Sequence, residues 1–261
     1  MRHVLWIGGP PGSGKTTVAT RLAKRHGLRW YNADTRTWAH RDRALRDGNE
    51  AAHRWEAWRY TRHTSLTPEE MLAMSLHQER GQMVVDDLLA TPTSPMTVAE
   101  GTTVSAALVA GPARSVWLIP TPELQHARLT ERDGDANELY LLLAAEIERE
   151  ARKHGAPILM IDGSQTIDDT LAAVEGLFAE ALAAGPRAET PAERRALLRE
   201  ANLAIVEQIR AFYARPWADG DADSTDRSFV CECGDPACEE SVVLAVGAVA
   251  AGPALAPGHM P

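Results

Sequence analysis

The sequence predicts an α/β protein in which a parallel sheet is covered by helices on both faces. Short apolar segments alternate with helical segments through residues 1–184. Each apolar segment is continuous rather than alternating with polar residues, which is typical of strands buried on both faces of a parallel sheet. The first of them leads into residues 9–16, GPPGSGKT, which fit the phosphate-binding pattern G-x-x-x-x-G-K-[ST] at every fixed position. A charged helix and a cysteine-containing segment follow this α/β part.

The glycine-rich stretch has the flanking elements that a phosphate-binding loop (P-loop) requires. Residues 3–7 predict a short buried strand before it, and residues 15–26 predict a helix after it. Glycines let backbone N–H groups turn toward phosphate oxygens, and a helix N-terminus adds partial positive charge. Lys15 is then expected to reach the β- and γ-phosphates of ATP, and the Thr16 hydroxyl to bind Mg²⁺. The residues expected to hold the nucleotide are Gly9, Gly12, Ser13, Gly14, Lys15, Thr16 and Thr17.

Composition is that of an ordinary globular protein and argues against two classes of partner. The chain has 261 residues, of which 44% are hydrophobic and 24% charged. Its net charge of −9 argues against nucleic-acid binding through a broad cationic surface. No apolar run approaches the roughly 20 residues that span a membrane, and the early first strand leaves no room for a signal peptide. Because the three cysteines are clustered, they do not form a disulfide framework, and we expect a cytoplasmic location.

The region after the second predicted strand, residues 28–32, is unusual in composition. Asp34 follows this strand, and residues 36–63 then hold seven arginines, the last of them Arg62, among several tryptophans. Such a region suits a pocket for an anionic or planar ligand. It equally suits a helical insert whose tryptophans pack against the core.

The remaining elements alternate in the same manner. A long helix is expected from Thr67 to residue 90, because Thr67, Pro68 and Glu70 form a helix start. Since ligands of parallel sheets bind beyond the carboxyl ends of strands, the polar residues at those ends are the ones to expect at a site. Further strands are predicted at residues 96–100, 115–119 and 157–161, and further helices at 121–131, 138–154, 165–184 and 190–213.

Residues 1–184 resemble the P-loop small-molecule and nucleotide kinases, a group that includes adenylate, shikimate and gluconate kinases. The resemblance lies in the P-loop, Asp34 after strand two, Glu100-Gly101 after strand three, the arginine-bearing helix after strand four, and residues 162–164 after strand five. It implies a P-loop NTPase fold with a five-stranded parallel sheet in the order 2-3-1-4-5. We therefore expect a kinase-like domain at 1–185, with an acceptor region at 36–90 and a lid at 121–154, and a separate C-terminal module at 187–261.

The resemblance also implies roles for single residues. Arg128 and Arg132 would be lid arginines that stabilise charge on the transferring phosphoryl group, although a solvated helix surface accounts for them equally. Asp34 would receive the proton of the acceptor hydroxyl, or would only cap a turn. Glu100 would contact Mg²⁺ through water or bind the acceptor. Gly163 and Ser164 would line the adenine base, unless Ser164 only caps the last helix.

The C-terminal segment carries a second signal. Cys231, Cys233 and Cys238 offer three thiolates on a tight turn, and His259 is available as a fourth ligand, which predicts a structural Cys3His Zn²⁺ site. The alternative is three reduced thiols without a metal. The segment resembles a small cysteine-containing module found at the end of various actinobacterial proteins. We expect metal to hold it together, because so Ala/Gly-rich a tail is not expected to build a core of its own.

These expectations converge on Mg²⁺-dependent phosphoryl transfer from ATP to a small-molecule acceptor. Two alternatives stay open. In a nucleoside monophosphate kinase, the arginines of residues 36–63 would hold the acceptor phosphate. In a nucleotide-gated interaction protein, ATP hydrolysis would be slow and the zinc module would bind a protein partner.

Overall fold

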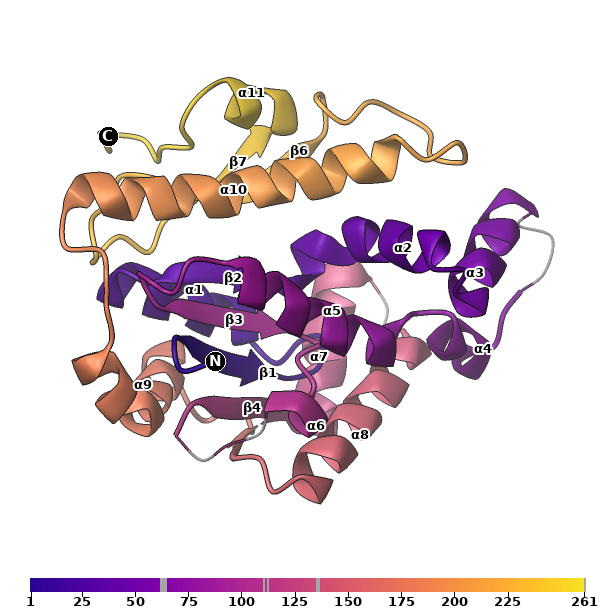
Figure 1. The fold of residues 1–261 in the computed structure, drawn as a ribbon, viewed down its shortest axis with the longest axis horizontal. Coiled ribbons are helices and arrows are strands. Elements are labelled where there is room, and N and C mark those ends of the chain that lie inside the picture. The colour runs from indigo at the N-terminus through magenta and orange to yellow at the C-terminus, as the bar shows by residue number, and fades with distance from the viewer. Residues whose placement is uncertain (62–64, 110, 112, 135–136, 261) are drawn as a thin grey trace.

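The computed structural model describes residues 1–61, 65–109, 111, 113–134 and 137–260. Arg62 of the arginine-rich stretch and residues 135–136 of the expected lid therefore lie outside the described residues. Figure 1 shows the elements, which in chain order are β1 (Val4–Gly8), α1 (Lys15–His26), β2 (Arg29–Asn32), η1 (Ala33–Arg36), α2 (Thr37–Arg46), α3 (Glu50–Thr61), α4 (Pro68–Ala73), α5 (His77–Ala90), β3 (Thr97–Gly101), α6 (Ala106–Val109), β4 (Ser115–Pro120), α7 (Pro122–Asp133), α8 (Glu138–Lys153), β5 (Ile158–Ile161), α9 (Ile167–Ala184), α10 (Pro191–Tyr213), β6 (Asp226–Val230), β7 (Ser241–Ala245) and α11 (Val246–Ala251).

The main sheet is parallel and its strands run in the order β2-β3-β1-β4-β5, which confirms the expected topology. Ile7 of β1 and Asn32 of β2 both pair with Glu100 of β3. The residues that follow β1 and β2 therefore meet Glu100 at one edge of the sheet. This register brings the P-loop and Asp34 together although they are far apart in the sequence.

Alternate strand residues pack into two apolar layers, one on each face of the sheet. On one face, residues such as Leu5 and Leu118 pack with α1, α9 and α10. On the other face, Trp6 and Trp117 pack with α5 and α8. Continuous apolar strands are needed for this arrangement, because neither face of the sheet is left to solvent.

The expectation of one helix from Thr67 to residue 90 is wrong, because the segment forms two helices, α4 and α5. The helix start predicted from Thr67, Pro68 and Glu70 is present, and Thr67 and Glu70 form a capping box there. The break lies at Ser75, whose Oγ donates to the Leu72 carbonyl and accepts from the His77 N–H. These local hydrogen bonds compete with helical ones, and the following residue, Leu76, takes a left-handed φ of 60° with its side chain buried.

Arginines and tryptophans of the insert pack against the C-terminal segment. The Arg59 guanidinium lies 4.2 Å from the ring centroid of Trp217, whose Nε1 donates to Glu56 at 2.7 Å. Arg215, just after α10, stacks on Trp38 at 5.0 Å. Of the two interpretations of this region, these contacts support packing, with α10 and the loop after it as the surface that is covered.

The C-terminal segment has an apolar cluster of its own, so the expectation that it lacks a core is wrong. Strands β6 and β7 form an antiparallel hairpin. The hairpin and α11 pack on α10 and bury Phe229 and Val249 almost completely. The full cluster of buried residues is Val206, Phe229, Val246, Val249 and Ala254.

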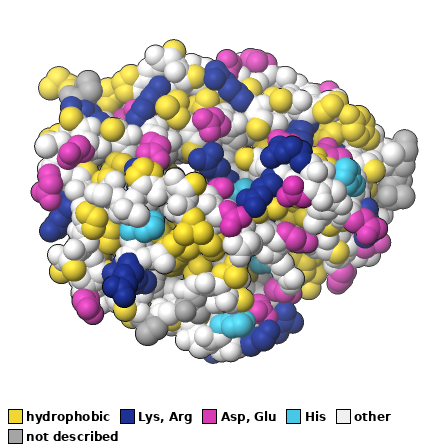
Figure 2. Space-filling view, in the orientation of Figure 1, with side chains coloured by type: hydrophobic (Ala, Val, Ile, Leu, Met, Phe, Trp, Pro, Cys, Tyr) yellow, Lys and Arg dark blue, Asp and Glu magenta, His cyan; other side chains and the backbone are white. Residues whose placement is uncertain are grey.

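The surface seen in Figure 2 mixes both signs of charge, with lysine and arginine interspersed among aspartate and glutamate rather than gathered in a stripe. A mixed surface of this kind gives that face no continuous track for a polyanion. None of the helices within the described ranges is long and apolar enough to cross a membrane.

Candidate active site and metal centre

The loop between β1 and α1 has the backbone shape that phosphate binding needs. Gly9, Gly12 and Gly14 have φ values of 147°, 81° and 84°, which residues with a side chain rarely adopt. A β-carbon on Gly9 would lie 2.5 Å from the Leu118 carbonyl oxygen, so only glycine fits there. Gly14 precedes α1 without any side-chain cap, which leaves N–H groups of the first helical turn available to an anion.

Two polar side chains inside the loop also suit phosphate oxygens. The Ser13 hydroxyl is buried and has no hydrogen-bond partner among the described residues. The Lys15 side chain is only 6% exposed, and its Nζ donates to the Pro10 carbonyl at 3.4 Å. A buried hydroxyl without a partner and a buried ammonium with one long hydrogen bond both gain from a bound anion. The loop therefore fits the phosphates of ATP.

Glu100 connects the P-loop to the end of β3. It is fully buried, and its Oε2 accepts a 3.3 Å hydrogen bond from the Thr16 hydroxyl. Burial raises the pKa of Glu100 to about 7, which Lys15 opposes and Asp34 adds to. Its other oxygen, Oε1, has no partner within the described part of the chain. A carboxylate oxygen and a threonine hydroxyl side by side are oxygen ligands of the kind that Mg²⁺ takes, directly or through water.

Asp34 lies in the short helix η1 at the end of β2, and its side chain is exposed. The cap of this turn is Asn32, whose Oδ1 accepts from the Asp34 N–H at 2.8 Å. The Asp34 carboxylate makes no hydrogen bond or ion pair with any residue that the structure describes. Asn32 therefore caps this turn, and the Asp34 carboxylate is close enough to Glu100 for its charge to raise the pKa of Glu100.

Arg80 of α5 belongs to this site and was missed by sequence reasoning. Its side chain is 6% exposed, and its Nη2 donates at 2.6 Å to the carbonyl of Ala33, the residue before Asp34. Burial lowers the pKa of Arg80, while the charge of Asp34 opposes that shift. An arginine within a polar helix carries no sequence signal that separates it from a surface arginine, so only the fold reveals this support.

Two side chains of helix α7 hydrogen-bond to the P-loop. Arg128 donates to the Gly12 carbonyl at 3.0 Å, and Gln125 donates to the Pro11 carbonyl at 3.0 Å. Gln125 lies three residues before Arg128, and this helical spacing could have identified it. Arg132 instead forms a 2.6 Å ion pair with Asp133, is about half exposed, and makes no contact with the loop within the described residues.

The two residues expected near the base follow β5. Gly163 has a φ of 91°, and a β-carbon there would lie 3.4 Å from Leu124 of α7. Ser164 closes a turn by donating its N–H and its hydroxyl to the Asp162 carboxylate. The cap of α9 is Thr166, which forms a capping box with Asp169. Ser164 therefore does not cap that helix.

A cavity of about 440 Å³ opens beside Thr16 and Asp34. Its inner wall is formed by α1 and the end of β2, and its outer wall by the C-terminal segment through residues such as Gln208 and Ser228. Another cavity of about 440 Å³, between α5, α6 and α8, contains no P-loop residue. Of these two cavities, the one that contains Asp34 adjoins the phosphate-binding loop.

The charged groups that line this cavity have an ion-pair or hydrogen-bond partner, with one exception. Arg21 forms a 2.7 Å ion pair with Glu239. Lys24 donates to the Glu240 carbonyl at 3.2 Å. Within the described residues, Asp34 is the one charged lining group without a partner. The cavity therefore presents an unpaired negative charge next to Thr16.

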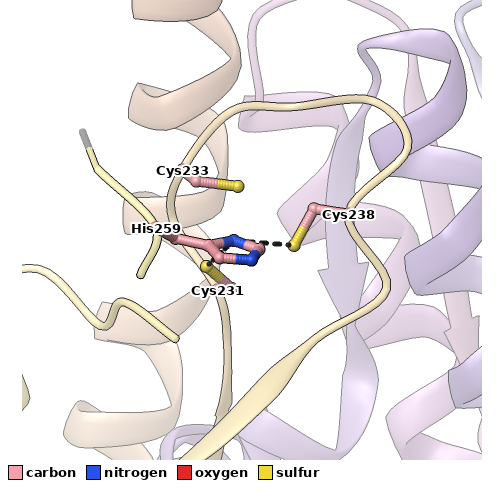
Figure 3. Close-up of side chains that lie close together, drawn as sticks. All are labelled: Cys231, Cys233, Cys238 and His259. Carbon is pink, nitrogen blue, oxygen red and sulfur yellow. Dashed lines mark hydrogen bonds between the residues drawn. The ribbon is translucent and has the colours of Figure 1, made fainter. Parts of the chain in front are cut away.

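Four side chains at the end of the C-terminal segment point toward one centre (Figure 3). Cys231 and Cys233 follow β6, Cys238 precedes β7, and His259 comes from the chain after α11. Their ligand atoms all lie within 4.8 Å of one another. His259 Nδ1 lies 3.5 Å from Cys231 Sγ and 3.7 Å from Cys238 Sγ. This Cys3His cluster could hold a metal ion.

The surroundings of the cluster also suit metal-bound thiolates. The Ala256 N–H donates to Cys231 Sγ at 3.3 Å. Burial opposes ionisation of Cys231, but hydrogen bonds from backbone N–H groups and the neighbouring thiols hold its pKa below the ordinary value. Burial raises the pKa of Cys238 to about 11 in the absence of a metal. A thiol with a lowered pKa beside one with a raised pKa agrees with a site that a cation would complete.

Comparisons with known proteins found one family and several similar solved structures. Residues 4–157 match the family described as "AAA domain". Solved structures similar to the chain include TT1252 from Thermus thermophilus, at 21% identity and a TM-score of 0.44, covering 66% of this chain and 96% of that one. They also include shikimate kinase from Acinetobacter baumannii in complex with shikimate, at 18% identity and a TM-score of 0.41, covering 68% and 93%. A comparison with curated proteins found no match. Since the family match spans more than half of the sequence, from β1 to the residue before β5, the chain belongs to the AAA-domain family and has a P-loop nucleotide-binding fold.

Proposed function

We propose that this protein is a Mg²⁺-dependent kinase that transfers the γ-phosphoryl group of ATP to a hydroxyl of a small molecule. The observation that carries the proposal is the grouping of Lys15, Glu100 and Asp34. The charges of Lys15 and Asp34 both act on the pKa of Glu100, so the three groups share one electrostatic environment. Phosphoryl transfer needs a loop that binds phosphate, a group that contacts the metal ion and an accessible carboxylate. Lys15, Glu100 and Asp34 offer these at one edge of the sheet.

Each part has a distinct role in the proposed reaction. The loop N–H groups, Ser13 and Lys15 hold the phosphates, and Thr16 with Glu100 would hold Mg²⁺, which neutralises phosphate charge when bound. Asp34 orients the acceptor hydroxyl and receives its proton late, because the transition state is loose. Arg128, already hydrogen-bonded to the loop, supplies positive charge near the transferring group. Gly163 and Ser164 would lie along the base.

The cavity beside Asp34 favours an uncharged or cationic hydroxyl-bearing acceptor. Apolar side chains such as Trp30 and Phe229 form part of its lining, and hydroxyl and amide groups, including those of Thr17, Gln208 and Ser228, form the rest. Of its cations, Arg21 is ion-paired with Glu239, and Lys24 is hydrogen-bonded to the Glu240 carbonyl and to Cys238, where zinc-bound thiolates would offset its charge. An acceptor phosphate or carboxylate would therefore meet Asp34 without an unpaired cation to offset it. This is an argument against the nucleoside monophosphate alternative.

A phosphoryl-transfer screen tests both the activity and the acceptor class. With γ-labelled ATP and Mg²⁺, label is expected in neutral polyols, hexoses or amino sugars, and not in nucleoside monophosphates or sugar acids. Turnover on the right acceptor should reach roughly 1–100 per second, whereas a nucleotide switch would hydrolyse ATP far more slowly. Slow hydrolysis with no labelled product across the panel would favour the switch.

Lys15→Ala provides the matched control for the screen. Because Lys15 is the mobile cation of the loop, this substitution should abolish transfer while the circular dichroism spectrum stays unchanged. Unchanged nucleotide affinity and unchanged transfer in a folded Lys15→Ala protein would contradict the proposed site.

We also propose that Cys231, Cys233, Cys238 and His259 hold one structural Zn²⁺. For Zn–S near 2.3 Å and Zn–N near 2.0–2.1 Å, the N···S edge of a tetrahedron is about 3.6 Å. The two N···S distances of 3.5 and 3.7 Å fall on that value. Elemental analysis of protein purified without added metal should give about one zinc per chain, and Cys233→Ser should lose it. A metal-free protein with an intact tail would contradict the assignment.

A further inference from the structure

We infer that Lys24, on the helix that follows the P-loop, is the outer-shell partner of the zinc centre and attaches the metal-binding loop to that helix. The inference rests on the proposed zinc site. It gives the C-terminal segment a role in nucleotide binding, through α1, that its position in the sequence does not suggest.

Lys24 contacts a metal ligand directly. Its side chain is 6% exposed, and its Nζ donates to Cys238 Sγ at 3.7 Å and to the Glu240 carbonyl at 3.2 Å. A buried ammonium is costly unless its hydrogens are satisfied and its charge is offset. The sulfur and the carbonyl supply the hydrogen-bond acceptors, and a metal-bound thiolate supplies the negative charge.

The charge of the metal site calls for one cation of this kind. Zn²⁺ with three thiolates and a neutral imidazole carries a net charge of −1. Of the cations nearby, Arg21 pairs with Asp168 and Glu239, and Arg194 donates to the Lys24 carbonyl. Among the described residues, Lys24 is the cation in hydrogen-bond contact with a ligand sulfur. The positive charge of Lys24 therefore balances the charge of the loaded site, so that the zinc site and Lys24 together are neutral.

The same contact links the metal to the nucleotide site. Helix α1 begins with Lys15 and Thr16 and presents Arg21 and Lys24 three residues apart on one face. Both residues hold the chain around Cys238, Arg21 through its 2.7 Å ion pair with Glu239. A loaded metal site fixes this chain segment and therefore α1. Because a preorganised helix N-terminus binds phosphate with less loss of freedom, metal loading should strengthen ATP binding.

Cobalt substitution tests the first part of the inference. Co²⁺ bound in place of zinc should give thiolate-to-metal charge-transfer absorption in the full-length protein. Lys24→Met should shift this band, since a hydrogen bond and a positive charge on Cys238 sulfur are lost. It should also weaken zinc affinity roughly 10–100-fold, the range for an outer-shell partner. Lys24→Arg should largely restore both, and Lys153→Met, an exposed lysine on α8, is the matched control.

Titration with a fluorescent ATP analogue tests the second part. Chelating the zinc should weaken binding of the analogue to the unmodified protein, whereas Lys24→Met should bind weakly with or without zinc. A cobalt spectrum and zinc affinity unchanged in a folded Lys24→Met protein would overturn the inference while leaving the zinc site intact. Failure of the unmodified protein to bind Co²⁺ or Zn²⁺ would overturn both, and the Lys15→Ala comparison would still stand as the test of the kinase proposal.

Discussion

Two carboxylates at neighbouring strand ends differ in almost every physical respect. Glu100 is fully buried, and one of its carboxylate oxygens accepts a hydrogen bond from the Thr16 hydroxyl. Asp34 is exposed and carries no partner within the described residues. A buried carboxylate with a raised pKa is suited to holding a cation, whereas an accessible one is suited to orienting a substrate. Environment rather than residue type assigns the two roles.

Asp34→Asn is expected to keep ATP affinity and to lower turnover by roughly 10²–10⁴, the usual range for a positioned acid–base group. The amide keeps the shape of the side chain but cannot receive the proton. Steady-state kinetics with the acceptor found in the screen, together with analogue binding, measure both quantities. If turnover were intact and only the melting temperature fell, the role of Asp34 would be structural and Glu100 the next candidate.

Burial of Glu100 has a measurable consequence for stability in metal-free protein. Its pKa is raised from 4.5 to about 7, so the folded state binds this proton more tightly than the unfolded state. The stabilisation from that proton is present below pH 4.5 and is lost as pH rises through about 7. A rise of this size corresponds to roughly 3 kcal/mol.

Glu100→Gln should therefore be more stable than the unmodified protein at pH 8 in EDTA, with the difference shrinking toward pH 5. Urea unfolding at both pH values measures it. A stability difference that does not change with pH would mean that Glu100 titrates at its ordinary value in the folded protein.

At the scale of elements, α7 fixes the P-loop through hydrogen bonds. Gln125 and Arg128 bind two consecutive loop carbonyls from one face of the helix. Arg128→Ala should weaken ATP binding severalfold and lower turnover, because it removes both a loop contact and a positive charge. Arg132→Ala is the matched control and should have the smaller effect on analogue affinity, since Arg132 pairs with Asp133. Equal effects would indicate that the helix moves so that both arginines reach the nucleotide.

The sequence predicts elements well where local chemistry determines them, and less well where distant residues do. The P-loop, the five strands and the start of α4 depend on short patterns and are found as expected. The break before Leu76 depends on Ser75 bonding to its own backbone, which a helical apolar pattern hides. In the sequence, Lys24 is indistinguishable from a lysine on a helix surface. It is buried because the loop around Cys238, more than two hundred residues away, packs against it.

At the scale of the whole molecule, the C-terminal segment is built into the α/β part. Leu198, Ala201 and Val230 belong to the same apolar cluster as the sheet residues Leu5 and Leu118. Helix α10 lies along the sheet in Figure 1, with the hairpin beyond it. The segment thus touches the P-loop helix at one end and the α2–α3 insert at the other. Contacts this widespread predict that the chain unfolds as a unit.

Urea unfolding followed by tryptophan fluorescence and by release of zinc to a chromophoric chelator should give coincident transitions. Leu198 is 6% exposed within the shared cluster, so Leu198→Ala should cost about 2–5 kcal/mol and move both transitions together. Leu108→Ala, at a residue 47% exposed on α6, is the control and should shift neither by more than a few tenths of a kcal/mol. Zinc release well before the fluorescence change would instead mean that residues 187–261 unfold independently. In that case Leu198→Ala would move only the zinc-release transition. The contacts of Lys24 between the metal site and α1 would then be too weak to affect ATP binding.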